Sequence, residues 1–290
     1  MDKFLQLTLT GLTNGVILAL VALGFVLIYK ASDVINFAQG DFLLVGAYIT
    51  FALVAEAGIF WPVGVLLTLA VAVLLGLVVE RFVLRPLIGE PIISVIMVTI
   101  GLSSLIRAFI RGAWGTMGQP FPGFIPEENV RIAGAVVPAD RLIAIVLAAL
   151  LLVIFTLFFR YSRHGIAMRA TADDQQAALS MGISVKTIFA LAWSIAAVTA
   201  AIAGVLVANI IGVTGAVASF GLRVFPVVIL GGLDSIPGAI VGGVIIGLLE
   251  AYTGGYVGSG LGTVIPFIVL ILILMVKPYG LFGEERIERV

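Results

Sequence analysis

The sequence predicts an all-α, polytopic membrane protein: a transmembrane helical bundle with about eight or nine membrane segments, some of them broken or re-entrant. Hydrophobic residues make up 61% of the 290 residues and charged residues only 11%, with a mean hydropathy of +1.24. A soluble domain averages about 45–50% apolar and about 25% charged residues, so a globule of this size could not cover its apolar surface. The runs are also about twice the length of a barrel strand and lack in–out alternation, which favours helices.

The spanning helices follow from run length, because a membrane helix needs about 20 apolar residues. The first run has no basic flank beyond Lys3 and no convincing small-residue cleavage site, so we expect a retained helix rather than a signal peptide. Pro226 and Pro237 interrupt the stretch 220–253, which predicts two shorter helices that turn at 231–238. The uninterrupted runs are 4–29, 38–57, 61–80, 91–110, 140–159, 187–211 and 261–276.

We expect residues 1–290 to form a single transmembrane domain whose helices pack closely. The chain has 34 glycines, and pairs such as Gly238/Gly242 and Gly243/Gly247 have the spacing that lets two helix backbones approach. Because that spacing is common, it favours packing within the bundle over a dimerisation motif.

Two connections are long enough to carry a role of their own. Residues 111–139 contain four prolines, which predict an irregular external loop. Residues 160–186 contain four basic residues, and placing them in the cytoplasm puts seven basic residues inside and five outside. This assignment predicts an external N-terminus. The tail from Lys277, with Arg286 and Arg289, is then also cytoplasmic.

The 160–186 loop contains a pattern typical of a short helix. Thr171 or Asp173 is placed to cap its N-terminus, Asp173 and Asp174 suit its positive end, and Gly182 is placed to end it. One interpretation is a rigid helix that another protein can push, and the other is an ordinary solvated loop helix.

Polar residues interrupt the apolar pattern near residue 40. Asn36, Gln39 and Asp41 are costly in lipid and therefore face a partner or a watery path. The segment is either a turn at the membrane edge or a broken helix whose N-terminus points into a translocation pathway. A second break of this kind lies in the stretch 223–243. Its helix-break residues are Gly231, Gly232, Asp234, Pro237 and Gly238.

Four segments together resemble one family. Ile35-Asn-Phe-Ala-Gln-Gly-Asp41 resembles the N-F-A-H-G-E signature of the branched-chain amino acid ABC permeases of the LivH type, and 231–243 resembles their G-G-x-G-S-I-x-G segment. Residues 277–283 resemble their R-P-x-G-L-F-G end, and 176–182 resemble the E-A-A-x-x-x-G loop of ABC importer permeases. The departures are Gln39 for histidine, Asp41 for glutamate, Gln176 for glutamate and Lys277 for arginine. Because glutamine at position 39 replaces the titratable histidine of the family, we expect no proton-linked role for this residue.

The resemblance implies a permease subunit of a binding-protein-dependent ABC importer in the bacterial cytoplasmic (inner) membrane, carrying branched-chain or other amino acids by alternating access. The implied partners are a second, LivM-like permease or a second copy of this chain, two cytoplasmic ATPase subunits and an external solute-binding protein. ATP and Mg are expected on the ATPases, because no lysine of this chain follows P-loop glycines. Contact with the ATPases is assigned to Asp173, Asp174, Gln176, Ala177, Ala178 and Gly182. Small and polar side chains are expected to line the pathway, and the alternative is that they form hydrogen bonds between the helices of the bundle. They are Asn14, Asn36, Gln39, Asp41, Tyr48 and Asn209.

Other functions remain open to different degrees. The chain has no cysteine, one histidine and no net charge, so we expect no metal site, no enzyme centre and no nucleic-acid partner. Ion-coupled transport would need intramembrane ionisable residues, but these lie near predicted helix ends, where pairing or snorkelling is the simpler interpretation. They are Asp41, Glu80, Arg107, Arg223 and Glu250. An importer of urea, short amides or aromatic acids and a passive small-solute channel stay as alternatives.

Overall fold

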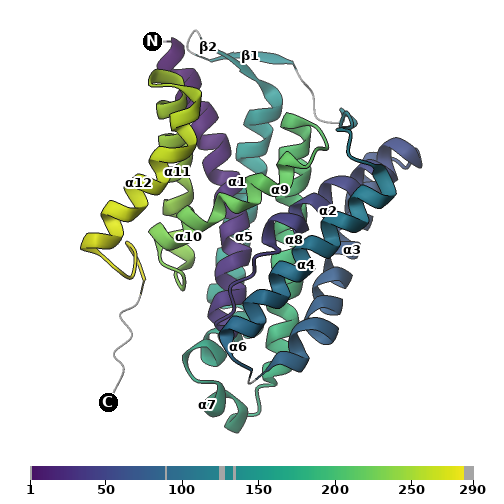
Figure 1. Ribbon diagram of the computed structural model, residues 1–290, viewed down its shortest axis with the longest axis vertical. Helices are drawn as coiled ribbons and strands as arrows, with labels where there is room; N and C mark the ends of the chain where they lie inside the picture. Colours follow the sequence, from purple (N-terminus) through teal and green to yellow (C-terminus); the bar gives the residue numbers. More distant parts are fainter. Residues whose placement is uncertain (1, 89, 124–127, 133–134, 284–290) are drawn as a thin grey trace.

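A computed structural model describes residues 2–88, 90–123, 128–132 and 135–283 of the chain, which form a bundle of helices (Figure 1). The helices are α1 Asp2–Ser32, α2 Gln39–Phe51, α3 Trp61–Val78, α4 Ile92–Trp114, α5 Ala139–Tyr161, α6 Arg163–Asp173, α7 Gln175–Ser180, α8 Val185–Ile211, α9 Ala216–Leu222, α10 Val224–Gly231, α11 Ile236–Tyr256 and α12 Ser259–Val276. Two π-helical turns, Ala52–Glu56 and Val79–Leu84, extend α2 and α3, and a 3₁₀ turn, Arg85–Leu87, follows the second.

The helix predictions from run length are confirmed. Within the described residues, seven helices are long and apolar enough to cross a membrane, and two shorter apolar stretches, 216–231 and 260–276, accompany them. This agrees with about eight or nine membrane segments. The predicted division of 220–253 is also confirmed, since α10 ends at Gly231 and α11 begins at Ile236. The chain is thus a multi-pass helical membrane protein.

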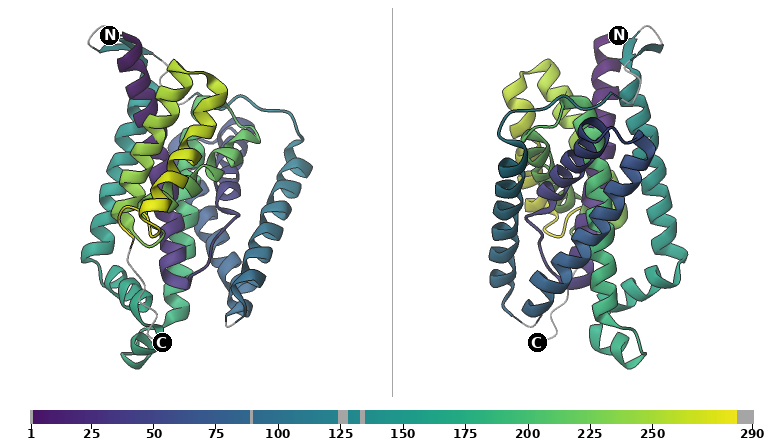
Figure 2. Two further views of the ribbon diagram at one scale, coloured as in Figure 1. Left: turned by 60° about the vertical axis from the view of Figure 1, so that its left-hand side comes forward. Right: turned by 90° about the vertical axis from the view of Figure 1, so that its right-hand side faces the viewer.

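The two ends of the bundle are built differently. The N-terminus and the strands β1 Asn129–Ile132 and β2 Ala135–Pro138 lie at one end, which we call the hairpin end, and α6 and α7 lie at the opposite, α7 end (Figure 1). The same separation appears from the side (Figure 2). The expectation that 111–139 is irregular is wrong in part, because β1 and β2 pair antiparallel from Asn129↔Pro138 to Ile132↔Ala135. The β-branched residues of this stretch favour strands. Its residues 124–127 and 133–134, and the tail residues 284–290, lie outside the described part of the chain.

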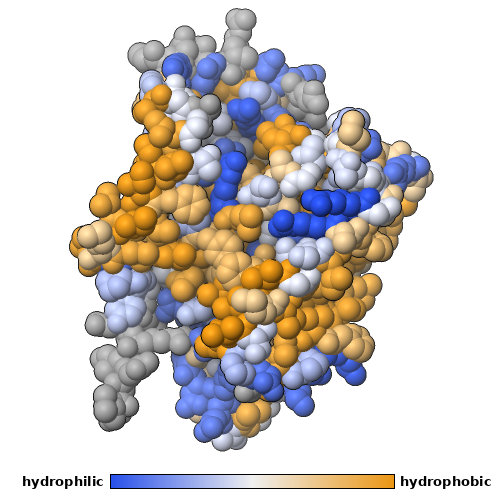
Figure 3. Space-filling view, viewed as in Figure 1, coloured by the Kyte–Doolittle hydropathy of each residue, from blue (hydrophilic) through white to orange (hydrophobic). Residues whose placement is uncertain are grey.

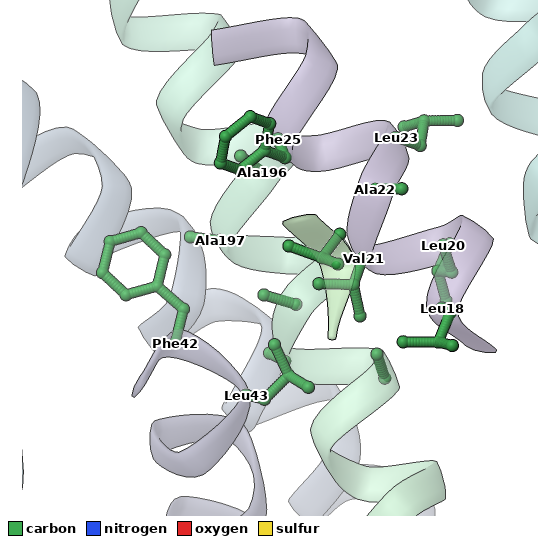
Figure 4. Packing of buried hydrophobic residues seen from close by; sticks show 14 of the residues in the cluster. Leu18, Leu20, Val21, Ala22, Leu23, Phe25, Phe42, Leu43, Ala196 and Ala197 are labelled. Carbon is green, nitrogen blue, oxygen red and sulfur yellow. The ribbon is translucent and has the colours of Figure 1, made fainter. Parts of the chain in front are cut away.

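Helix α1 forms the centre of the molecule. Phe25 of α1, Phe42 and Leu43 of α2, and Ala196 and Ala197 of α8 are buried together (Figure 4). The backbones of α1 and α11 approach closely, because a β-carbon on Gly15 would lie only 2.8 Å from the carbonyl oxygen of Gly243. This contact is within one chain, as the interpretation of the glycine spacing as bundle packing expects.

The outer helices α4 and α5 leave long rows of apolar side chains exposed. They include Ile93, Leu105 and Phe109 on α4, and Val146 and Val153 on α5. On the face that carries α4, the apolar surface is visible as a broad belt between the two polar ends (Figure 3). Such a belt is far larger than the apolar patches of soluble proteins and suits contact with lipid.

Candidate solute pathway and coupling helices

The polar segment near residue 40 forms a break inside the bundle. After α1 ends at the α7 end, the chain runs back into the bundle before α2 begins (Figures 1 and 2). This arrangement is the broken helix, and not the membrane-edge turn, of the two interpretations of the sequence. The N-terminal end of α2 and the carboxylate of Asp41 in its first turn therefore lie within the protein.

The polar groups of this break satisfy one another. Asn36 accepts a 3.0 Å hydrogen bond from the backbone N–H of Ala38 and donates one of 3.0 Å to Oε1 of Gln39. Gln39 in turn donates to the carbonyl oxygen of Ala196 at 3.4 Å, which joins the break to α8. Asn36 and Gln39 are both buried, so in this conformation their amides hold the break in shape.

Thr99 of α4 also supports the break, although the sequence did not single it out. Its hydroxyl oxygen accepts a 3.4 Å hydrogen bond from the backbone N–H of Phe37 and donates to the carbonyl oxygen of Ile96 at 2.8 Å. The signal available in the sequence was a lone threonine in an apolar helix. Such threonines commonly form hydrogen bonds only within their own helix, whereas Thr99 bonds both to Ile96 of its own helix and to Phe37.

Asp41 forms an ion pair with Arg107 of α4. Nε of Arg107 donates to Oδ1 at 2.6 Å and Nη2 to Oδ2 at 3.4 Å, while the carboxylate is fully buried. The other ionisable residues considered for ion coupling are also paired, Glu80 with Arg85 at 2.7 Å and Arg223 with Glu250 at 3.3 Å. The interpretation of these residues as pairing partners is therefore confirmed.

The other expected pathway residues lie around this core at different places. Tyr48 of α2 is buried, with its ring centroid 5.4 Å from that of Trp114. Asn14 lies in α1 and Asn209 near the end of α8, and both are half-buried. Neither of these two asparagines makes a side-chain hydrogen bond within the described ranges. The structure thus brings together Asn36, Gln39 and Asp41 but does not join Asn14 and Asn209 to them.

The glycine-rich break between α10 and α11 is completed by the end of the chain. The carbonyl oxygens of Leu230 and Gly231, at the end of α10, accept hydrogen bonds from the backbone N–H groups of Leu281 at 2.8 Å and Phe282 at 3.0 Å. A helix that ends inside a membrane protein needs such donors, because lipid supplies none. The segment 277–283 and the break 231–238 are therefore one structural unit, a contact that the sequence alone did not indicate.

Backbone geometry explains the small residues of this break. Gly232 has a φ of +109°, which disfavours any side chain, and a β-carbon there would lie 2.5 Å from the backbone nitrogen of Gly283. On the other side of the turn, Ser235 caps α11 by accepting a 3.1 Å hydrogen bond from the N–H of Gly238. Pro237 occupies the first turn of α11, where its missing N–H has no cost.

The start of α2 crosses α9, the short helix that precedes α10. Gly40 lies directly against the backbone of Ala218 and Gly221, and a methyl group on either glycine would overlap the other helix. Just beside this crossing the ring centroids of Phe37 and Phe225 are 5.0 Å apart. The polar segment before α2 and the segment before α10 are thus neighbours in the folded chain.

The 160–186 loop folds as two helices, not one. Ser162 caps α6 and Asp174 caps α7, with Oδ1 of Asp174 accepting from the N–H groups of Gln176 at 2.8 Å and Ala177 at 2.9 Å. The expectation that Thr171 or Asp173 is the cap is wrong, because both are inside α6 and the chain becomes extended only at Asp174. Gly182, with a φ of +82°, follows the end of α7 as predicted.

The residues assigned to ATPase contact differ in exposure. Asp173, Asp174, Gln176, Ala177 and Gly182 are exposed, whereas Ala178 is buried. Ala178 therefore packs α7 onto the rest of the chain and is not available to a partner. Sequence reasoning missed Leu179 and Met181, which are 57% and 83% exposed. Their apolar character in an otherwise polar loop was the available signal.

Within the ranges that the structure covers, no three His, Asp or Glu side chains are grouped so that they could hold a metal ion. Asp41, Glu80 and Glu250 are each paired with an arginine. The chemistry available to this site is therefore hydrogen bonding and charge recognition by fixed guanidinium groups and amides.

Comparison with known proteins gives a consistent result. Residues 7–274 match the family model described as the permease component of the branched-chain amino acid transport system. The chain is 31% identical to the high-affinity branched-chain amino acid transport system permease protein LivH of Escherichia coli (strain K12), over 99% of this chain and 98% of the relative. It is also 31% identical to the LivM permease protein of the same organism, over 77% of this chain and 58% of LivM. The solved structure of PsaBC from Streptococcus pneumoniae in complex with Fab has a similar fold, with a TM-score of 0.50 and 16% identity over 94% of this chain and 95% of that one.

Proposed function

The chain belongs to the branched-chain amino acid transport permease family, and we propose that it is the membrane permease subunit of a binding-protein-dependent ABC importer for branched-chain or other amino acids. The observation that carries the proposal is that the family's signature segments form breaks inside the helical bundle. The break before α2 touches α9, and the glycine-rich break after α10 binds the 277–283 segment. Broken helices inside a bundle are a common way to build a solute pathway.

The energy for transport comes, in this proposal, from ATPase subunits that bind the α7 end. The two short helices α6 and α7 project there between α5 and α8, and Leu179 and Met181 give α7 an exposed apolar contact. Since α6 is also tied to α5 by hydrogen bonds from Arg169 to the carbonyl oxygens of Phe159 and Arg160, a push on α6 and α7 reaches a membrane helix directly. ATP and Mg are held by the ATPases.

The orientation and the partners complete the proposal. The α7 end faces the cytoplasm and the hairpin end faces outward, where the solute-binding protein docks on the loop 111–139. A second permease subunit of the LivM type, or a second copy of this chain, provides the other half of the pathway. The similarity to both LivH and LivM supports this pairing, because related chains can pack with related surfaces. The assembly resides in the bacterial cytoplasmic membrane.

Purification and reconstitution test this function. The chain alone is expected to bind and hydrolyse no ATP and to move no leucine across liposomes, but to co-purify with its ATPase subunits when they are co-expressed. Rapid leucine flux through the lone chain would instead indicate a passive channel. Uptake of urea or acetamide, but not of leucine, by the assembled importer would indicate the alternative substrate class.

A further inference from the structure

Two arginines lie within the helical bundle, away from the ends of its long helices, and remain partly exposed. Arg107 is about 10 Å from the end of α4 at Trp114, and Glu250, the partner of Arg223, is about 9 Å from the end of α11 at Tyr256, at 1.5 Å per residue. The side chains of Arg107 and Arg223 are 37% and 39% exposed. Hydrophilic patches correspondingly interrupt the apolar belt over α4 and between α9 and α11 (Figure 3).

The two arginines belong to one surface, because both ion pairs adjoin the crossing of α2 and α9. Asp41, which holds Arg107, directly follows Gly40, and Arg223 lies two residues after Gly221. Gly40 and Gly221 are in backbone contact at that crossing. The ion pairs of Arg107 and Arg223 are therefore attached near a single point of the fold, although 116 residue positions separate the two arginines in the sequence.

Each guanidinium keeps hydrogen-bond donors that its carboxylate does not use. Arginine has five N–H groups, and Arg107 directs only Nε and Nη2 to Asp41, while Arg223 directs Nη1 to Glu250. Free donors of a cation are costly against lipid, so this face is covered by protein or water in the membrane. Because the carboxylates fix the orientation of the two groups, the free edges form a prepared surface for planar anions.

We propose that Arg107 and Arg223 bind the carboxylate of an α-amino acid as it passes between this chain and its permease partner. This inference rests on the proposed importer function and names the substrate group that the pathway recognises. The apolar side chain of the solute meets Phe37, Phe225 and the exposed Leu222 at the same crossing. Asp41 and Glu250 offset part of the positive charge, so the carboxylate is held weakly enough to be released. Urea and simple amides lack the anionic group that this surface recognises.

The absence of cysteine from the sequence allows a direct test of the surface in the assembled importer. Leu222→Cys places a thiol next to Arg223, and Val153→Cys on α5, 56% exposed on the apolar belt, is the matched control. The probes are two water-soluble methanethiosulfonates, one carrying a sulfonate and one a trimethylammonium group. We expect both to modify L222C and neither to modify V153C.

Charge recognition is measured by adding Arg223→Gln to the L222C protein. Loss of a cation within several ångströms lowers the ratio of the sulfonate rate to the trimethylammonium rate by about fivefold or more. An unreactive L222C in the assembled importer, or an unchanged ratio in the R223Q background, would overturn the proposal, because the surface would then be dry or the arginine would not act on anions there.

Transport separates solute binding from a merely structural ion pair. We expect R107Q and R223Q to lower the initial rate of leucine uptake at least about tenfold, as removal of a charge-assisted contact does. R85Q is the matched control for loss of an ion pair, because it also leaves a buried glutamate without its arginine. Arg85 lies in the 3₁₀ turn after α3, away from the crossing of α2 and α9, so we expect uptake per amount of folded protein to stay within about twofold of the wild type.

The double variant D41N/R107Q keeps an amide pair between α2 and α4 but removes the guanidinium. If Arg107 binds solute, the uptake rate of the double variant stays as low as that of R107Q. Recovery to the wild-type rate would show that Arg107 only packs α4 against α2, and would contradict the proposal. A wild-type assembly that takes up no leucine would count against the importer function itself, while normal uptake by R107Q and R223Q would count against the arginine site alone.

Discussion

The backbone N–H of Leu281 donates a 2.8 Å hydrogen bond to the carbonyl oxygen of Leu230, and this bond attaches the end of the chain to the end of α10. Helix α10 ends at Gly231, short of the α7 end of the bundle (Figure 1). The C-terminal segment thus supplies donors to a helix terminus that would otherwise meet apolar surroundings. The motifs at 231–238 and 277–283, which lie far apart in the sequence, therefore form one turn together.

Gly280→Ala tests the importance of this attachment. Gly280 has a φ of +81°, and a β-carbon there would lie 2.8 Å from the backbone nitrogen of Gly232. We expect a loss of about 1–3 kcal/mol in stability, measured as a fall of several degrees in the melting temperature of the purified protein in detergent. Gly254→Ala is the control, because that helical glycine faces open space. Equal melting temperatures for the two variants would show that the segment contributes little.

Gly15→Ala tests the close approach of α1 and α11. The added methyl group would meet the carbonyl oxygen of Gly243 at 2.8 Å, and α1 is enclosed on all sides and has little freedom to move. Overpacking of this kind costs about 1–3 kcal/mol, which thermal unfolding in detergent detects. Gly101→Ala on the outer helix α4, where nothing lies near the new methyl group, should be neutral or slightly stabilising. A more stable G15A protein would contradict the packing described for α1.

Asp174→Ala tests the cap of α7. Loss of the two hydrogen bonds that Asp174 accepts should cost about 1 kcal/mol and loosen α7. Hydrogen exchange of the amides of Gln176 and Ala177 should therefore rise in the variant. Asp173→Ala is the control, since Asp173 is also exposed and acidic but accepts neither of these bonds. Faster exchange in D173A than in D174A would show that Asp173, as first expected from the sequence, caps the helix.

Crosslinking tests which end of the bundle meets the ATPase. A cysteine at Met181, 83% exposed at the end of α7, should crosslink to a co-expressed ATPase subunit, whereas a cysteine at the buried Ala178 should react far less. Crosslinks to the ATPase obtained only from cysteines in the loop 111–139 would reverse the proposed orientation.

The helices could be predicted from the sequence because each follows from a local property. Long apolar runs fix the spans, and Pro226 with Pro237 fixes the break at 231–238. The residue that caps a helix was harder to predict where several neighbouring residues could do so. Thr171, Asp173 and Asp174 all favour a helix N-terminus, but Thr171 and Asp173 lie inside α6 and the chain becomes extended only at Asp174, which caps α7.

The partners of the polar residues could not be predicted, because they come from distant segments. Asp41 and Arg107 were each noticed as costly in a membrane, but nothing local pairs one with the other across 66 positions. The contact of Leu281 with Leu230 is made by backbone atoms, which no side-chain pattern reveals. The candidate site was thus located by its polar residues in the sequence, while its arrangement depends on how α2, α4, α9 and α10 pack.

Leucine uptake by defined proteoliposomes tests the central claim most directly. The chain is reconstituted with its second permease and two ATPase subunits, and uptake of labelled leucine is followed with and without ATP and the solute-binding protein. The proposed function predicts uptake against a gradient only when both are present, and none from the chain alone. Leucine equilibration through the chain alone, without ATP, would contradict it.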